Sequence, residues 1–292
     1  MNMKNILYIL TIAIFLSCSD DRITLLEENV EFESMDAFFN QHQPSDQEFI
    51  ITGDTGQVIT ALGGTQLFVD SSVFVNSSGL DVSYPFSIKF LELYSYSDMI
   101  LSQVDIGRSG TVSRNSPGLG RLLAFKNNDT LSVKFGKEYN VNFIDIGTTI
   151  ASLQEYYGGK DSFNSWTSNG SSVNSIGSYF SFQGNTSGWI NPSGAPSLIG
   201  VTSYLAVNLP NNDFQNTYVY VLINDYKGLV RYTGSMNMEG GLSVKVIAFG
   251  KISGQQGYSW FETDLIMNIG HYVNVSFDTV TESELLSNIN SL

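Results

Sequence analysis

The stretch Phe86-Ser87-Ile88-Lys89-Phe90-Leu91 alternates apolar and polar side chains with the two-residue period of a β-strand. The polar Lys89 between apolar neighbours is typical of an antiparallel sheet with one face in water. The same strand-like pattern recurs along the chain, at residues 49–51, 66–69, 131–135, 204–209, 218–223, 242–249 and 272–277. These segments predict an all-β fold.

Turn-forming residues separate these segments, for example at 127–129, 211–213 and 239–241. Residues 151–177 are rich in Gly, Ser and Asn, which favours a linker between domains. We therefore predict two β-sandwich-like domains, at residues 49–150 and 178–292. Thr281-Glu282-Ser283-Glu284 forms a capping-box pattern and predicts a short helix at the C-terminal end.

The first residues have the pattern of a signal peptide, with Lys4 followed by an uncharged, mostly apolar run from Ile6 to Leu16. This run is about half the roughly 20 residues that a membrane-spanning helix needs. Leu16-Ser17-Cys18 resembles the lipobox of bacterial lipoproteins, which implies that residues 1–17 are removed and that Cys18 carries the lipid anchor. The alternative is an ordinary secretory signal followed by a free cysteine. Cys18 is the only cysteine, so no disulfide within the chain competes for it.

Residues 18–48 carry nine acidic side chains against Arg22 alone, in a chain whose formal net charge is −14. This composition predicts an acidic tether. Within it, Met35, Phe38 and Phe39 follow Ser34 at helical spacing, so we expect a short helix that docks on the first domain. Nucleic acid is not an expected partner, because the chain has no surplus of basic residues to neutralise phosphates.

Three segments resemble elements of a family of Bacteroidota surface lipoproteins of uncharacterised function: residues 64–69, Asp98-Met99-Ile100-Leu101 and Gly188-Trp189-Ile190-Asn191. The resemblance implies two β-domains, with sandwiches distantly like those of immunoglobulins, ankyrins and netrin receptors. Asp20 and Asp21 resemble the family's export signal, which implies the cell-surface side of the outer membrane; the periplasmic side is the alternative. The sequence departs from the family at Pro192-Ser193, where the family often has Cys-Asp, so no role of those residues is transferred.

No nucleophile elbow, zinc-protease helix, phosphate loop or calcium-binding loop occurs in the sequence. His42 and His271 are the only histidines, so we do not expect a catalytic triad or a metal site that depends on several histidines. Glu92, Asp98, Glu262 and Asp264 are nominal candidates for a carboxylate-based hydrolase, although solvent-facing positions are the simpler interpretation. We predict no cofactor and assign no metal site, with a calcium site built from Asp70, Asp81 or Asp98 as the alternative.

Aromatic residues offer another route to function, because exposed rings bind the apolar faces of sugars. We consider Trp166 and Trp260 as ligand-binding candidates, with core packing as the alternative. Thr130 and Thr279 lie in Asp-Thr-apolar triplets that resemble the O-glycosylation motif of the Bacteroidota.

These features together predict a non-enzymatic lipoprotein of the outer membrane, with a structural or binding role. A carbohydrate-binding lipoprotein of a polysaccharide-uptake system is the alternative, and an unrecognised hydrolase is the third hypothesis. The expected partners are the membrane, through the lipid on Cys18, and an envelope protein or a glycan.

Overall fold

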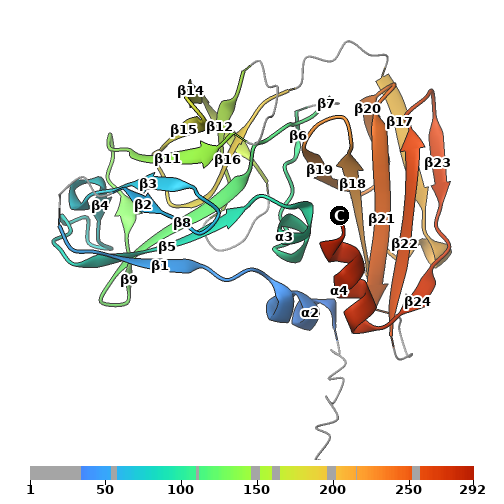
Figure 1. Ribbon diagram of the computed structural model, residues 1–292, viewed down its shortest axis with the longest axis horizontal. Helices are drawn as coiled ribbons and strands as arrows, with labels where there is room; N and C mark the ends of the chain where they lie inside the picture. Colours follow the sequence, from blue (N-terminus) through green and yellow to red (C-terminus); the bar gives the residue numbers. More distant parts are fainter. Residues whose placement is uncertain are drawn as a thin grey trace, which may run out of the picture. The chain divides into compact units, whose positions relative to one another are not determined.

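The computed structural model describes residues 34–53, 58–109, 112–145, 152–159, 165–195, 202–214, 216–251 and 257–292. These ranges are mostly β-strand, arranged in several sheets with a short helix at the C-terminal end (Figure 1). The predicted all-β fold is therefore confirmed. The signal peptide, Cys18 and the acidic residues up to Glu33 lie outside the described residues.

Two sheets form the first sandwich. Sheet A has the strand order β1 (Gln47–Ile51), β5 (Phe86–Leu93), β8 (Leu119–Lys126), β16 (Gly188–Ser193), β12 (Gln154–Tyr157) and β13 (Thr167–Ser172), with β9 (Asp129–Thr130) also paired to β8. Sheet B has the order β14 (Asn174–Ile176), β15 (Tyr179–Gly184), β11 (Tyr139–Ile144), β3 (Gln66–Phe68) and β2 (Ile59–Thr60). Two small ladders are separate from these sheets: β4 (Phe74–Val75) with β10 (Ser132–Val133), and β6 (Arg108–Ser109) with β7 (Val112–Ser113).

The side-chain alternation of β5 explains how this sandwich is filled. Phe86, Ile88 and Phe90 point into a core between sheets A and B, which we call the first core. Leu91 and Leu93 occupy the other face of the strand and are also buried, in a different cluster. Sheet A is therefore covered on both faces at this end of β5.

The second sandwich also has two sheets. Sheet C has the order β20 (Met236–Glu239), β17 (Thr202–Asn208) and β23 (His271–Asn274), and its β17–β23 pair is parallel. Sheet D has the order β19 (Gly228–Arg231), β18 (Thr217–Ile223), β21 (Ser243–Lys251), β22 (Tyr258–Ile266) and β24 (Asp278–Val280). A second core between these sheets includes Leu205, Val207, Val221, Val246 and Val273.

Sheet D is buried on both faces of its central strands. On β18, Val221 points into the second core, while its neighbours Tyr220 and Leu222 point the opposite way into a third cluster, the junction core. On β21, Val246 likewise points into the second core, and Phe249 points into the junction core. This double burial accounts for the nearly continuous apolar run of these strands.

The junction core joins the two sandwiches. It combines Leu93 and Trp189 of sheet A with Phe249 and Trp260 of sheet D. Three helices contribute to it, α2 (Met35–His42), α3 (Tyr96–Leu101) and α4 (Glu282–Asn290), and Figure 1 shows α3 and α4 between the sandwiches. Two 3₁₀ turns, η1 (Ser71–Val73) and η2 (Pro210–Asn212), complete the described elements.

Helix α2 forms where the spacing of Met35, Phe38 and Phe39 predicts it. The Ser34 side chain caps it by accepting a hydrogen bond from the Ala37 amide at 3.2 Å. The helix packs in the junction core and not on the first domain alone: Phe38 contacts Tyr258, and Phe39 contacts Tyr218 at a ring distance of 4.8 Å. Both partners belong to sheet D, so the described end of the expected tether is folded onto the second sandwich.

Helix α4 confirms the capping-box prediction. Thr281 Oγ1 accepts a hydrogen bond from the Glu284 amide, and the Glu284 carboxylate accepts one from the Thr281 amide at 2.8 Å. Leu285 and Ile289 of the helix are fully buried in the junction core.

The boundary between the two sandwiches differs from the expected one. The described residues of the expected 151–177 linker form β12, β13 and β14, which pair within sheets A and B. Strands β15 and β16, which begin the expected second domain, pair with β11 and β8 of the first sandwich. The small polar residues of this region suit exposed edge strands as well as a linker, and composition does not distinguish the two.

Candidate functional site

The two tryptophans considered for sugar stacking are packed into the protein. Trp260 is 6% exposed and stacks on Phe249 with ring centroids 6.0 Å apart. Trp166 is half-buried against the junction core, and its Nε1 donates a hydrogen bond to the carbonyl oxygen of Asp105 at 2.8 Å. Because stacking needs an open ring face, core packing describes both residues better than a binding platform does.

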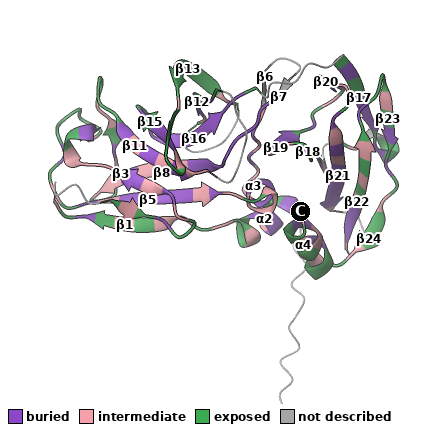
Figure 2. Ribbon diagram, turned by 45° about the horizontal axis from the view of Figure 1, so that its top comes forward, coloured by how far each residue is buried: buried purple, intermediate pink, exposed green. Residues whose placement is uncertain are grey.

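Two other aromatic side chains are exposed, on the outer face of sheet C. Tyr204 of β17 is 37% exposed and Tyr272 of β23 is 69% exposed. Leu205 and Val273 point into the second core, so the neighbouring tyrosines point outward. Figure 2 shows exposed residues along β23.

The parallel pairing of β17 and β23 brings the two rings together. Tyr272 lies opposite Ala206, two residues from Tyr204 on the same face. The ring centroids are 6.1 Å apart and the ring planes are inclined by 59°. The small Ala206 side chain, opposite Tyr272, lets the two rings approach each other. The pair therefore presents a bent aromatic surface and not a flat one.

Three asparagines surround the pair. Asn208 lies opposite Asn274, and its Nδ2 donates a hydrogen bond to Asn274 Oδ1 at 2.9 Å. Asn237 of β20 lies opposite Tyr204. All three are exposed, and the donors and acceptors left over from the single amide pair face solvent. We call Tyr204, Asn208, Asn237, Tyr272 and Asn274 the tyrosine face.

The tyrosine face contains no acidic or basic side chain, although the chain as a whole carries a formal charge of −14. Glu239 lies on the same side of β20, opposite Thr202, but it is only 7% exposed and burial raises its pKa. Aromatic rings bind apolar C–H surfaces and amides exchange hydrogen bonds with hydroxyl groups. The arrangement is therefore chemically suited to an uncharged, hydroxyl-rich ligand.

The four carboxylates considered for hydrolysis occupy three separate places. Glu92 accepts hydrogen bonds from the Gly63 and Thr65 amides and supports the turn before β3. Asp98 lies in the first turn of α3. Glu262 and Asp264 are brought together by Lys245, whose Nζ lies 3.3 and 3.4 Å from their oxygens. This last pair shares an exposed ion-pair network on β22.

Glu155 is a buried carboxylate that the sequence pattern does not single out. It is 1% exposed and accepts three hydrogen bonds, from the Gln183 amide at 2.7 Å, the Tyr157 hydroxyl at 3.0 Å and Asn169 Nδ2 at 3.1 Å. Burial, and secondarily the Glu155 charge, raise the pKa of Tyr157. Glu155 therefore ties β12, β13 and β15 together inside the first sandwich.

The two histidines lie in different elements. His42 Nε2 and Glu282 Oε1 are 2.8 Å apart, which links α2 to α4. His271 lies at the start of β23, opposite Leu205. Within the described residues, no group of three His, Cys, Asp or Glu side chains is arranged to hold a metal ion.

The two threonines considered for glycosylation differ in accessibility. Thr279 is exposed on β24, whereas Thr130 is half-buried on β9 opposite Phe125. Their modification stays a prediction. Cys18, the expected lipidation site, lies outside the described residues. In the part of the chain that the structure describes, no helix has the length and apolar character of a membrane span.

Comparisons with known proteins add no relative: no protein-family model, curated protein or solved structure matches this chain. The site must therefore be interpreted from its own geometry.

The signal for the tyrosine face is present in the sequence but ambiguous. Tyr204-Leu205-Ala206-Val207-Asn208 alternates as a strand should, and the inward positions are the aliphatic ones. Tyrosine suits a core as well as a surface, so alternation alone does not place the ring in solvent. The pairing of β17 with β23, which is distant in sequence, is also needed to bring Tyr272 beside Tyr204.

Proposed function

We propose that this chain is a non-enzymatic, lipid-anchored protein of the outer membrane that binds neutral polysaccharide chains through the tyrosine face. The observation that carries the proposal is the exposed Tyr204–Tyr272 pair, flanked by asparagines, on the open side of sheet C. Exposed aromatic residues with hydrogen-bonding neighbours are what a sugar chain requires of a protein surface.

The charge and the shape of the tyrosine face restrict the class of polysaccharide that we propose as its ligand. An uncharged face on an acidic protein offers no cation to pair with uronates or sulfates, and the overall negative charge repels them. The 59° inclination of the rings suits one chain lying across the pair better than the flat surface of a crystalline polysaccharide. We therefore favour single neutral chains.

The membrane attachment belongs to the same proposal. The signal-peptide pattern, the Leu16-Ser17-Cys18 lipobox and the resemblance to Bacteroidota surface lipoproteins support a lipid on Cys18. An outer-membrane anchor would hold the tyrosine face close to extracellular polysaccharides. The cell-surface side is the side we propose.

Affinity gel electrophoresis of the full chain in detergent tests the binding function. The gels contain dextran, galactomannan or xyloglucan as neutral soluble chains, and polygalacturonate as an anionic chain. We expect retardation by at least one neutral chain and none by polygalacturonate. Tyr204→Ala and Tyr272→Ala should each weaken binding about tenfold, since an aromatic contact contributes about 1.4 kcal/mol.

Matched variants separate binding from general surface effects. Tyr272→Phe keeps the ring and should bind within about twofold of wild type. Phe135→Ala removes another fully exposed aromatic ring, in the turn after β10, and should leave binding unchanged. The proposal fails if no neutral chain retards the protein, or if Phe135→Ala is as damaging as Tyr272→Ala. A tyrosine face buried in a dimer, seen as Tyr272→Ala producing monomers, would also contradict it.

Cys18→Ala tests the anchor independently. The variant should lose incorporation of a fatty-acid analogue and should leave the membrane fraction. Continued labelling or membrane retention would rule out Cys18 as the attachment point.

A further inference from the structure

Asn169-Gly170 is the only Asn-Gly pair in the sequence, and it lies in an irregular part of β13. Ser168 and Ser172 of β13 pair with Tyr156 and Gln154 of β12, so one residue of β12 faces three residues of β13. Strand β13 is at the edge of sheet A, and all of its residues are exposed. The Asn-Gly pair therefore occupies a solvent-exposed β-bulge.

The backbone nitrogen of Gly170 is open to reaction. Gly170 is not among the residue pairs that join β12 and β13, and its N–H donates to the neutral hydroxyl of Ser168 at 3.0 Å. Its φ of +82° lies in the region that favours glycine, so the bulge and the absence of a Cβ beside this nitrogen go together.

Hydrogen bonds at both ends orient the side-chain amide of Asn169. Oδ1 accepts from the Ser171 amide at 2.8 Å, and Nδ2 donates to Glu155 Oε2 at 3.1 Å and to the Tyr157 hydroxyl at 3.4 Å. The Asn169 Cγ and the Gly170 nitrogen are close because a short run of covalent bonds joins them. The N–H that donates to Oδ1 stabilises the negative charge that this oxygen gains when a nucleophile attacks Cγ.

We propose that Asn169 is a site of spontaneous deamidation, with water as the only co-reactant. The Gly170 nitrogen gives its proton to water and attacks Asn169 Cγ, the Cγ–Nδ2 bond breaks, and Nδ2 takes up a proton and leaves as ammonia. The succinimide ring that results then adds one water molecule, which breaks one of its two C–N bonds and yields aspartate or isoaspartate. No atom is oxidised or reduced. The inference does not depend on the proposed function.

The product places a negative charge beside a buried one. Glu155 is 1% exposed, and deamidation replaces the Asn169 Nδ2 donor at its carboxylate with a second carboxylate. Two like charges this close are unfavourable where water does not screen them. Isoaspartate also lengthens the backbone of β13 by one carbon atom. Both products therefore weaken the attachment of β13 to the rest of the first sandwich.

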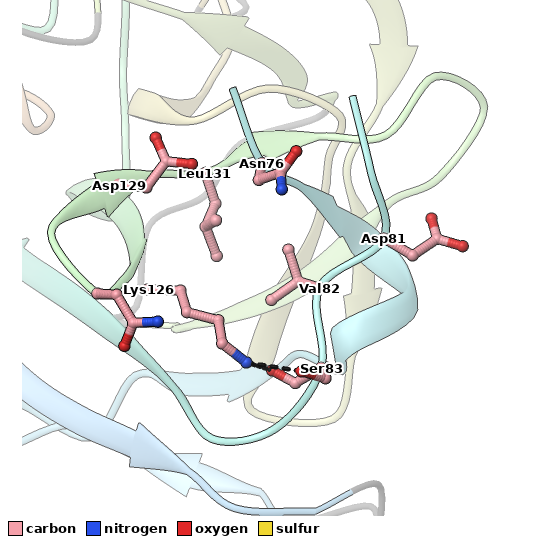
Figure 3. A pocket seen from close by; sticks show the side chains of 8 residues that line it. Asn76, Asp81, Val82, Ser83, Lys126, Asp129 and Leu131 are labelled. Atoms are coloured by element: carbon pink, nitrogen blue, oxygen red, sulfur yellow. Dashed lines mark hydrogen bonds between the residues drawn. The ribbon is translucent and has the colours of Figure 1, made fainter. Parts of the chain in front are cut away.

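Asn76 is an internal comparison, since it has a similar local hydrogen bond but a different neighbour. Its Oδ1 accepts from the Ser78 amide at 3.0 Å. The next residue is Ser77, whose Cβ crowds the attacking nitrogen and whose amide donates to Asp129 Oδ2 at 3.1 Å. Asn76 and Asp129 line the cavity of about 310 Å³ that Figure 3 shows. Because a nearby negative charge opposes loss of the amide proton, we expect Asn76 to keep its amide.

Incubation of the full chain in detergent at pH 8, followed by chymotryptic peptide mapping, tests the modification. Cleavage after Trp166 and Tyr179 releases the peptide 167–179, which contains both Asn169 and Asn174. We expect Asn169 to gain one mass unit at a rate within tenfold of that in the free synthetic peptide, and electron-transfer fragmentation to detect isoaspartate. Asn174 and Asn76 should react at least tenfold more slowly than Asn169.

Two variants test the chemistry separately from the fold. Gly170→Ala crowds the attacking nitrogen, and Asn169→Gln requires a larger ring to close. Each should lower the rate of mass gain at residue 169 at least tenfold.

Asn169→Asp reproduces one product and tests its effect. We expect this variant to lower the urea midpoint of the folded protein, whereas Asn174→Asp, at an exposed position of β14, should leave the midpoint nearly unchanged. The inference is overturned if Asn169 reacts in the free peptide but not in the folded chain, or if Gly170→Ala and Asn169→Gln react as fast as wild type. Equal midpoints for Asn169→Asp and Asn174→Asp would overturn the effect on the first sandwich.

Discussion

Lys227 lies in the turn between β18 and β19, where the second sandwich meets the first. Its Nζ donates a hydrogen bond to the Tyr94 carbonyl, and the Tyr94 ring lies 5.8 Å away. Burial lowers the pKa of Lys227 from 10.5 to about 8, although the nearby Asp98 carboxylate opposes the shift. A half-buried ammonium group is thus a feature of the junction.

We predict that Lys227 makes stability depend on pH between about 8 and 10.5. In this window the unfolded chain holds a proton on Lys227 that the folded chain has released, so the free energy of unfolding rises with pH. The slope is up to about 1.4 kcal/mol per pH unit. Lys227→Met should remove it.

Urea unfolding of both proteins at pH 7, 8, 9 and 10 measures this slope. Above pH 10 buried tyrosines act in the opposite direction, since burial raises the pKa of Tyr96 to about 12, but they act equally in both proteins. Lys137→Met, at an exposed lysine, is the control and should keep the wild-type slope. Parallel pH profiles for wild type and Lys227→Met would contradict the prediction.

At the scale of elements, α2 is a short helix whose stability depends on its packing. Eight residues are too few for a stable isolated helix, so the burial of Met35, Phe38 and Phe39 in the junction core must hold it. The next element, β1, pairs with β5 in sheet A. Residues 35–51 therefore contact both sandwiches.

We predict that Phe39→Ala destabilises the protein by about 3–5 kcal/mol, because it leaves a cavity where a ring 1% exposed had packed. Asn40→Ala, at the next and exposed position of the same helix, should change stability by about 0.5 kcal/mol or less. Urea denaturation midpoints compare the two. Similar midpoints would mean that α2 contributes little to the folded state.

At the scale of the whole molecule, residues 32–292 form one compact unit. The two sandwiches share the junction core and are also joined by hydrogen bonds. The Ile106 amide donates to the Leu229 carbonyl at 2.9 Å, and the Arg231 amide donates to Asp105 Oδ2 at 2.8 Å. These links couple β19 to the loop after α3.

We predict that the two sandwiches unfold in a single transition, because separating them exposes the junction core. Trp189 reports on sheet A and Trp260 on sheet D. Fluorescence of Trp189→Phe and Trp260→Phe variants and far-ultraviolet circular dichroism should therefore give each protein one coincident midpoint. Two separated transitions in the wild type would show that the sandwiches unfold independently.

How much of the fold the sequence predicts depends on how far apart in the chain the interacting residues lie. The strands, the helix at Met35–His42 and the capping box at Thr281 follow from residues a few positions apart, and the structure confirms them. The assignment of β15 and β16 to the first sandwich depends on pairing with β11 and β8, which is not encoded in local periodicity.

By itself, the sequence determined that this protein is built of β-strands, because side-chain alternation is a local property that survives any arrangement of the sheets. It also predicts the lipid anchor at Cys18, because the lipobox is a short local motif that does not depend on how the chain folds. Only the tertiary structure decided which aromatic rings are exposed to solvent and can contact a ligand. Trp260 is covered because sheet D is buried on both faces, whereas Tyr204 and Tyr272 are open because sheet C is covered on one. Which face of a strand meets another layer depends on contacts between distant segments, and no local pattern contains them.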